Sequence, residues 1–244
     1  MDGLPRVEVT ALSHTGAVRE HNEDSLAVAG WVLDGDLSTP RQTRHTLAQP
    51  LVFAVADGMG GHAGGEIASR YATKRLAETP IDAAAAALRG RLEAINKELY
   101  QTMKAVPSLL GMGTTVAGLL LSAARALWFN VGDSRIYRFR RSRLEQLSID
   151  DVPPGPRSGL ITQTLGGAPI LVPIAPHIGE EAIVLPSRWL LCSDGLTDML
   201  DDADIERVLA TNDEPAVRAL FAAAMDAGGA DNISIVLVSI KAGE

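Results

Sequence analysis

Four acidic motifs, widely separated along the 244-residue chain, limit its possible folds more than any other feature. Each places Asp or Glu beside Gly or Asn where an apolar segment begins or ends: Asn22-Glu23-Asp24, Asp57-Gly58-Met59-Gly60-Gly61-His62, Ser193-Asp194-Gly195 and Asp231-Asn232. A fold can bring such strand ends together, and clustered carboxylates repel one another unless they bind cations. The sequence therefore predicts a metal site with oxygen ligands at neighbouring strand ends.

The residue types in these motifs narrow the choice of metal. Magnesium and manganese prefer carboxylate, carbonyl and water oxygens, whereas zinc sites usually include His or Cys. The motifs contain neither a Cys pair nor a His pair at zinc spacing. We therefore favour magnesium or manganese.

Two of the motifs repeat one pattern, an apolar run followed by Asp-Gly. Asp57 follows the run 51–56, and Gly58 has no Cβ, so its carbonyl can approach a cation closely. An isolated Asp-Gly usually indicates a turn, but its recurrence at Asp194 weakens that interpretation. Arg19, four residues before Glu23, could either pair with these acids or bind a substrate phosphate.

Composition and charge exclude several classes of protein. The hydrophobic share of 46% and charged share of 21% are ordinary for one globular domain. A net charge of −8 argues against nucleic acid as a partner, and the basic run 138–143 is typical of a solvated hairpin turn. The start of the chain lacks a signal pattern and the longest apolar region, 114–131, is interrupted by Ser122 and Arg125. We expect a cytoplasmic protein without a membrane span.

The predicted elements alternate in groups, which favours an α+β layered architecture over strict βαβ alternation. Strand-like segments occupy 7–12, 25–32, 51–56, 114–121, 126–131, 136–139, 188–192 and 232–240. Helical patterns occupy 65–77, about 80–103 with Thr79 as N-cap, 204–210 and 214–226. The Pro-rich stretch 150–159 is predicted to be a loop, and Cys192 an inert thiol in an apolar strand.

One alternative function starts from the glycines after Asp57. The segment Gly58 to Ala63 matches a dinucleotide-binding fingerprint, and Glu78 follows about twenty residues later. However, a second helix is predicted where that fold needs a parallel strand, and Asp57 would face the pyrophosphate. A dinucleotide oxidoreductase is therefore the weaker hypothesis.

Six motifs, in this order, resemble those of the protein phosphatase 2C family in its bacterial form. They are residues 18–25 with Asn22-Glu23-Asp24, Asp57-Gly58-Met59-Gly60-Gly61-His62, Gly113-Thr114-Thr115, Val131-Gly132-Asp133-Ser134-Arg135, Ser193-Asp194-Gly195-Leu196 and Asp231-Asn232. The resemblance spans nearly the whole chain. It implies a metal-dependent serine/threonine phosphatase with a four-layer α/β/β/α sandwich of two antiparallel sheets flanked by helix pairs.

The resemblance also implies a site for two magnesium or manganese ions and a place for a third, weaker ion. The residues assigned in this way are Asp57 as the bridge, Asp194 and Asp231 for the first ion, Glu23 and the Gly58 carbonyl for the second, and Asp133 with Asp194 for the third. By the same resemblance Arg19 binds the substrate phosphate and Asp24 orients the attacking water. His62 is a candidate proton donor to the leaving oxygen, although a helix-start residue is an equally good interpretation.

Two departures from the family pattern stand out. Met59 follows Asp57-Gly58, where eukaryotic members carry a histidine. Relatives usually carry Asp-His-Ser, a helical flap and then Leu-Thr-Arg-Ala-Leu-Gly, whereas this chain has Asp150-Asp151, a short Pro-rich segment and residues 161–166, Ile-Thr-Gln-Thr-Leu-Gly. We therefore expect one phosphatase domain over 1–244 with a shortened flap at about 150–160.

The expected partners follow from this hypothesis. Phosphorylated proteins would be the substrates, in opposition to a cognate serine/threonine kinase, and the protein would act as a monomer. A non-catalytic sensor on the same fold is a further alternative, but such a protein is expected to lose metal ligands. All of the assigned ligands are present in this chain.

Overall fold

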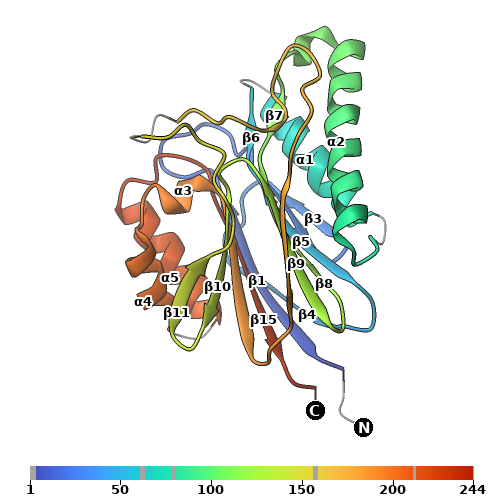
Figure 1. The fold of residues 1–244 in the computed structure, drawn as a ribbon. Coiled ribbons are helices and arrows are strands. Elements are labelled where there is room, and N and C mark those ends of the chain that lie inside the picture. The colour runs from blue at the N-terminus through green and yellow to red at the C-terminus, as the bar shows by residue number, and fades with distance from the viewer. Residues whose placement is uncertain (1–3, 61–63, 79–80, 156–158, 211–212, 244) are drawn as a thin grey trace.

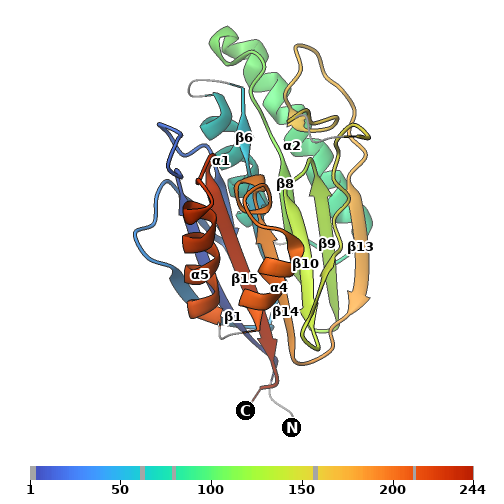
Figure 2. The same cartoon turned by 90° about the vertical axis from the view of Figure 1, so that its left-hand side faces the viewer.

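Two six-stranded antiparallel sheets lie face to face in the computed structural model, which describes residues 4–60, 64–78, 81–155, 159–210 and 213–243. Helices cover the outer face of each sheet, so that the protein has four layers (Figure 1). Both termini lie at one end of the sandwich, and the view turned by 90° shows the same arrangement (Figure 2). The predicted α/β/β/α sandwich is confirmed.

The first sheet contains both terminal strands. Its order is β11 (Arg143–Gln146), β10 (Arg135–Arg140), β14 (Ser187–Cys192), β15 (Ile233–Lys241), β1 (Arg6–His14) and β4 (Arg41–Thr46). The helices over this sheet are α3 (Asp194–Thr197), α4 (Asp202–Leu209) and α5 (Asp213–Asp226). Asp201 caps α4 by accepting a hydrogen bond from the Asp204 N–H at 2.8 Å.

The second sheet has two long helices on its outer face. Its order is β13 (His177–Ala182), β9 (Arg125–Val131), β8 (Val116–Leu121), β5 (Leu51–Ala56), β2 (Ser25–Val28) and β3 (Trp31–Asp34). The helices are α1 (Gly64–Ala77) and α2 (Ala85–Ala105), followed by the short 3-10 turn η1 (Pro107–Leu109). A small third sheet joins β12 (Leu165–Gly166), β7 (Gly113–Thr114) and β6 (Gly58–Met59).

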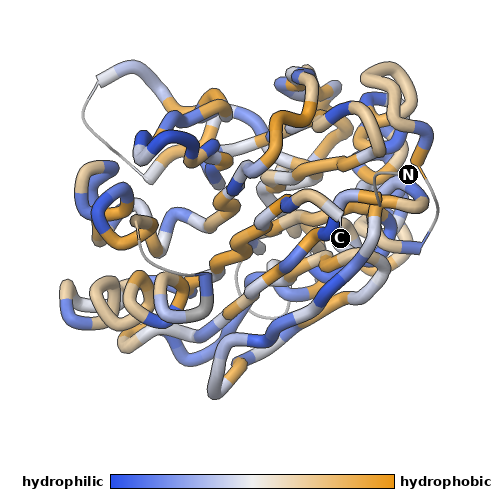
Figure 3. The backbone as a smooth tube through the Cα atoms, turned by 90° about the horizontal axis from the view of Figure 1, so that it is seen from below, coloured by the Kyte–Doolittle hydropathy of each residue, from blue (hydrophilic) through white to orange (hydrophobic). Residues whose placement is uncertain are grey.

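Three apolar clusters hold these layers together, one between the sheets and one under each layer of helices. The central strands are therefore buried on both faces. Along β15, Val236 and Val238 pack between the sheets, whereas Ile235 and Leu237 pack under the helices. This explains why β15 is an almost continuous apolar run. On α2, the predicted stripe is buried against the second sheet: Leu88, Leu92, Ile95, Leu99 and Met103. Seen from the end with the termini, the helices carry both hydrophilic (blue) and hydrophobic (orange) residues (Figure 3).

Several predicted elements need correction. Residues 25–32 are not one strand, because Ala29 and Gly30 adopt positive φ angles of 47° and 91° and turn the chain from β2 into β3. Helix α2 begins at Ala85, five residues later than predicted, and residues 81–84 are not helical. The side chain of Ile81 is buried in the core instead. The Thr79 cap lies outside the described residues. No strand was predicted at β4, β6, β11, β12 or β13, and the predicted segment 25–32 covers only the first two residues of β3.

Other predictions agree with the structure. The basic run 138–143 forms the β10–β11 hairpin, with Arg141 and Ser142 at positive φ in its turn. Cys192 is fully buried, and burial raises the pKa of its thiol to about 12, which disfavours the reactive thiolate. Within the described ranges, no helix is long and apolar enough to cross a membrane.

The dinucleotide-binding alternative is wrong. Every pairing between described strands in the two large sheets is antiparallel. Helix α1 leads to α2 and not to a parallel strand beside β5. The crossover that a dinucleotide-binding fold requires is therefore missing from the described chain.

Candidate metal centre

The four acidic motifs meet at the end of the sandwich opposite the termini. Strand β5 ends where its antiparallel neighbour β2 begins, and β14 ends where β15 begins. These ends lie around one cavity of about 670 Å³ whose lining includes Arg19, Glu23, Asp57, Gly58, Asp194 and Asp231. Chain segments up to 212 residues apart in sequence thus form one site, as the motifs predicted.

Asp24 is not among the residues that line the cavity and is buried more deeply than the acids that do, with 1% of its surface exposed. Ser193 Oγ, from the other sheet, donates to Asp24 Oδ2 at 2.9 Å, whereas Asp24 Oδ1 has no hydrogen-bond partner among the described residues. Burial raises the pKa of Asp24 to about 8. Its hydrogen bond with Ser193 ties the first acidic motif to the third.

The backbone of Asp57 is fixed by Thr114, the last residue of β7, and Thr115, which follows it. Thr115 N–H and Thr114 Oγ1 donate to the Asp57 carbonyl at 2.9 and 2.8 Å, and Asp57 N–H donates to Thr115 Oγ1 at 3.2 Å. The pKa of the Asp57 carboxyl lies well above its usual range because of burial and the neighbouring carboxylates Asp24 and Asp194. The role of the two threonines was not predicted, although the Gly-Thr-Thr motif was the signal for it.

Gly58 occupies a position that no larger residue could take. A Cβ there would lie 2.3 Å from the Gly65 carbonyl oxygen and 2.5 Å from that of Glu23. Since both contacts are with backbone atoms, neither could move away easily. The close approach of α1 to the Glu23 loop therefore requires glycine beside Asp57.

Asp194 lines the cavity, and together with Asp133 it also lines a smaller cavity. Asp194 is the first residue of α3, and Asp133 lies in the turn between β9 and β10. Burial, with charge repulsion from Asp133, raises the pKa of Asp194 to about 7, and burial raises the pKa of Asp133 to about 6. The Oδ1 atoms of both residues are buried and have no hydrogen-bond partner within the described chain.

Arg19 lies at the mouth of the cavity and pairs with an acid from the far end of the sequence. Its Nη2 donates to Asp231 Oδ2 at 2.5 Å, and 56% of its side chain is exposed. Burial raises the pKa of Glu23, and the positive charge of Arg19 partly opposes this shift. The sequence left two roles open for Arg19, pairing with an acid or binding phosphate. In this structure its guanidinium pairs with Asp231.

Asn232 fixes the loop that carries Arg19 and Glu23, a role that was not predicted. Its Oδ1 accepts from the Glu23 N–H at 2.8 Å, while its Nδ2 donates to the carbonyls of Thr15 and His21 at 2.9 Å. The Asp231-Asn232 motif thus supplies one acid and one anchor for the first acidic motif.

The donor set fits hard divalent cations. Three buried carboxylate oxygens without hydrogen-bond partners, on Asp24, Asp133 and Asp194, point to missing positive charge. The described residues nevertheless include no group of three His, Cys, Asp or Glu side chains placed to hold one ion. The assignment of individual ligands therefore stays a prediction, and His62 lies outside the described residues.

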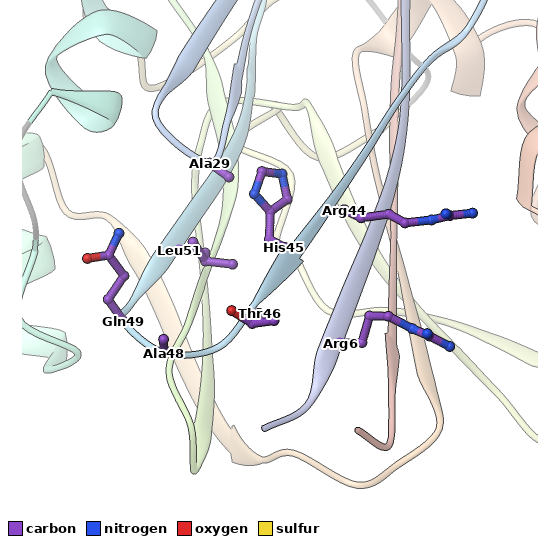
Figure 4. Close-up of a pocket in the computed structure, with 8 residues that line it drawn as sticks. All are labelled: Arg6, Ala29, Arg44, His45, Thr46, Ala48, Gln49 and Leu51. Carbon is purple, nitrogen blue, oxygen red and sulfur yellow. The ribbon is translucent and has the colours of Figure 1, made fainter. Parts of the chain in front are cut away.

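A second pocket, of about 480 Å³, opens at the end of the molecule that carries the termini (Figure 4). Arg6 and Arg44 extend to one side of its strands, and His45 lies on the other. Its lining residues include no acid. It does not share the chemistry of the acidic cavity.

Comparison with known proteins identifies the class. The model of the family described as protein phosphatase 2C matches residues 20–166, which is more than half of the chain. The chain belongs to the protein phosphatase 2C family of metal-dependent serine/threonine phosphatases. The family, fold and enzyme class that the motifs predicted are confirmed.

Individual relatives come from several bacteria. The serine/threonine phosphatase stp of Listeria welshimeri is 29% identical, with 91% of this chain and 92% of the relative covered. The phosphatase PstP of Mycobacterium tuberculosis is 31% identical over 94% of this chain, which spans only 44% of that protein.

Solved structures agree with these relatives. A crystal structure of PstP from M. tuberculosis has a TM-score of 0.80 and 29% identity, with 97% of this chain and 99% of that chain covered. Its catalytic domain with two manganese ions has a TM-score of 0.79 at the same identity and coverage. PppA of Pseudomonas aeruginosa, described as a regulatory component of T6SS, has a TM-score of 0.77 at 29% identity, with 97% of each chain covered.

Proposed function

We propose that the protein hydrolyses phosphoserine and phosphothreonine in proteins with two magnesium or manganese ions at the acidic cavity. The observation that carries this proposal is the set of unpartnered, buried carboxylate oxygens on Asp24, Asp133 and Asp194. A relative of known structure binds two manganese ions, which supports the same number here. Asp133 with Asp194 would hold a third, weaker ion.

The proposed ligand set follows the family resemblance and the positions around the cavity. Bound divalent cations would supply Lewis-acid activation of a water molecule and would neutralise charge on the phosphoryl oxygens. The residues proposed to hold them are Asp57 as the bridge, Asp194 and Asp231 for one ion, and Glu23 with the Gly58 carbonyl for the other.

The other residues of the site would position the reactants. Arg19 lies at the cavity mouth, where its planar guanidinium can exchange Asp231 for two phosphate oxygens and orient the ester. Asp24, held by Ser193, would orient the attacking water. The water oxygen bonds to phosphorus as the ester bond breaks, so that free phosphate and the Ser or Thr hydroxyl are released without a phosphoenzyme. His62 is the candidate proton donor to the leaving oxygen.

The same proposal extends to the biological setting. The relatives are named serine/threonine phosphatases, so the natural substrates would be phosphoproteins modified by a cognate serine/threonine kinase. The resemblance to PppA supports a link to the regulation of a secretion system. We propose that a monomer is sufficient, because the proposed ligands of the two ions and Arg19 line one cavity within a single chain.

Manganese-dependent release of phosphate from p-nitrophenyl phosphate and from a phosphothreonine peptide tests this function. Asp57→Asn should lower both rates by at least about a hundredfold, because losing one group that stabilises transition-state charge typically costs that much. Glu180→Gln is the matched control, since Glu180 pairs with Arg125 on β9 outside the cavity lining. Metal binding without turnover would instead favour the non-catalytic sensor, and a trapped phosphoenzyme would refute direct hydrolysis.

A further inference from the structure

A single carboxylate, that of Asp151, joins three other segments next to the proposed active site. Its side chain is largely buried, with 12% exposed. Hydrogen bonds connect it to Gly132 in the turn before Asp133, to Gln163 just after the segment 152–161, and to His177 at the start of β13. None of the metal assignments uses this residue.

The first connection fixes the turn that carries Asp133. Asp151 Oδ2 accepts from the Gly132 N–H at 2.8 Å, and the Asp151 N–H donates to the Gly132 carbonyl at 3.0 Å. The neighbouring Asp150 accepts hydrogen bonds from Arg135 Nε at 3.2 and 2.9 Å and from Arg135 Nη2 at 2.7 Å. Both sides of the Asp133 turn are therefore bonded to residues 150–151.

The second connection ties Asp151 to the end of the loop 152–161, which the structure describes over 152–155 and 159–161. Thr162 N–H donates to the Asp151 carbonyl at 2.7 Å, and Gln163 Nε2 donates to Asp151 Oδ2 at 2.8 Å. Between these anchors, the loop contributes Val152 and Gly159 to a small cavity of about 70 Å³ that Asp133 and Asp194 also line. Gly159 and Ile161 line the main cavity. The anchored ends thus determine how this loop borders the site.

The third connection uses the remaining oxygen. His177, at the start of β13, lies with its Nε2 2.8 Å from Asp151 Oδ1. A carboxylate only accepts hydrogen bonds, so Nε2 carries the proton in this pair. Because both carboxylate oxygens of Asp151 are engaged, a change at this residue would loosen the turn, the loop and the strand together.

We propose that Asp151 is a positioning residue that sets where residues 152–155 and 159–161 lie relative to Asp133, and thereby the affinity for a protein substrate. Two departures from the family pattern, at Asp151 and Gln163, contact each other directly. The two replaced residues therefore form one hydrogen-bonded pair and are not two unrelated changes to the family motifs. The effect on substrate affinity rests on the proposed phosphatase function, whereas the effect on the loop does not.

Amide hydrogen exchange and steady-state kinetics test this role together. In Asp151→Ala the Gly132 amide loses its acceptor, so its exchange should accelerate at least about tenfold, as should exchange within the described parts of the loop. The KM for a phosphothreonine peptide should rise on the order of tenfold, while kcat for p-nitrophenyl phosphate, which is too small to contact the whole loop, changes by less than about threefold. Asp151→Asn keeps an acceptor oxygen, so its amide exchange and its KM should stay closer to those of the wild type than to those of Asp151→Ala.

The controls separate this role from a general loss of stability. Glu180→Gln, on the same strand as His177, should leave exchange and KM unchanged. If Asp151→Ala fails to fold, Gln163→Ala removes one of the same hydrogen bonds and should speed exchange at the loop end near Thr162. Unchanged exchange and KM in the folded variant would overturn the proposal. An inactive wild type would overturn the phosphatase function and the KM effect, while exchange would still decide whether Asp151 fixes the loop.

Discussion

The two ends of the sandwich treat their carboxylates in opposite ways. Near the termini, Glu8 on β1 lies within 4 Å of three cations, Arg6, Arg44 and Lys241. The hydrogen bond from Lys241 is the main reason why the pKa of Glu8 lies below its usual value. At the other end, burial raises the pKa of the clustered aspartates, and the nearby Arg19 pairs with Asp231.

The contrast distinguishes a carboxylate that is neutralised by cations of the protein itself from carboxylates that lack such partners. At the terminal end the protein supplies its own counter-charges, so the Glu8 carboxylate needs no ligand. At the acidic end, several carboxylates share a cavity with little basic compensation, and their ionised forms are disfavoured without added positive charge. The cation binding proposed for the acidic cavity therefore comes at a cost to the stability of the metal-free protein.

The largest expected effect is a pH dependence of stability in the metal-free protein. The folded-state pKa values of Asp24 and Asp194, about 8 and about 7, lie above the ordinary value of 3.8. Between pH 4 and 8 the folded state then binds more protons than the unfolded state, so the free energy of unfolding falls as pH rises. Each group contributes up to about 1.4 kcal/mol per unit of pKa shift.

Urea denaturation in EDTA at pH 5, 6, 7 and 8 measures this slope. Saturating manganese should remove most of it, because bound cations favour the ionised carboxylates. A metal-free stability that is flat or rises over this range would contradict the contrast between the two ends.

Much of the fold could be predicted because its central strands and the stripe on α2 are strongly apolar. The edge strands could not, since β4 (Arg41–Thr46) and β13 (His177–Ala182) are mostly polar and exposed and depend on their neighbours for pairing. The early start predicted for α2 followed local signals around Thr79 and Pro80. The burial of Ile81 in the core outweighed them.

The acidic residues of the site could be predicted because their chemistry is visible in the sequence. Their supports were harder to find, because Ser193, Thr115 and Asn232 act through hydrogen bonds between segments distant in sequence. The same holds for Asp151, which sequence alone marks only as a departure from the family pattern. Such roles depend on tertiary contacts and not on local pattern.

Asp194→Asn should have opposite effects on stability and activity. The change removes a charge that is unfavourable in the cavity, so the metal-free protein should gain about 2 kcal/mol in unfolding free energy at pH 8. It also removes a proposed metal ligand, so stabilisation by manganese should shrink. Thermal denaturation with EDTA and with a manganese titration measures both effects, and a metal-free protein less stable than wild type would argue against charge repulsion at this residue.

The smallest effect is expected at the terminal end, from Glu8→Gln. Glu8 is partly exposed, and exposed ion pairs typically contribute less than about 1 kcal/mol, which added salt screens. Because its folded-state pKa is lowered, this contribution is present above pH 4.5 and disappears as pH falls below that value. We expect a stability loss of less than about 1 kcal/mol at pH 7 and low salt, no loss at high salt, and unchanged stabilisation by manganese. A variant that altered the manganese response would show that the two ends of the sandwich are coupled, and that the charge of the acidic cavity is not a local property.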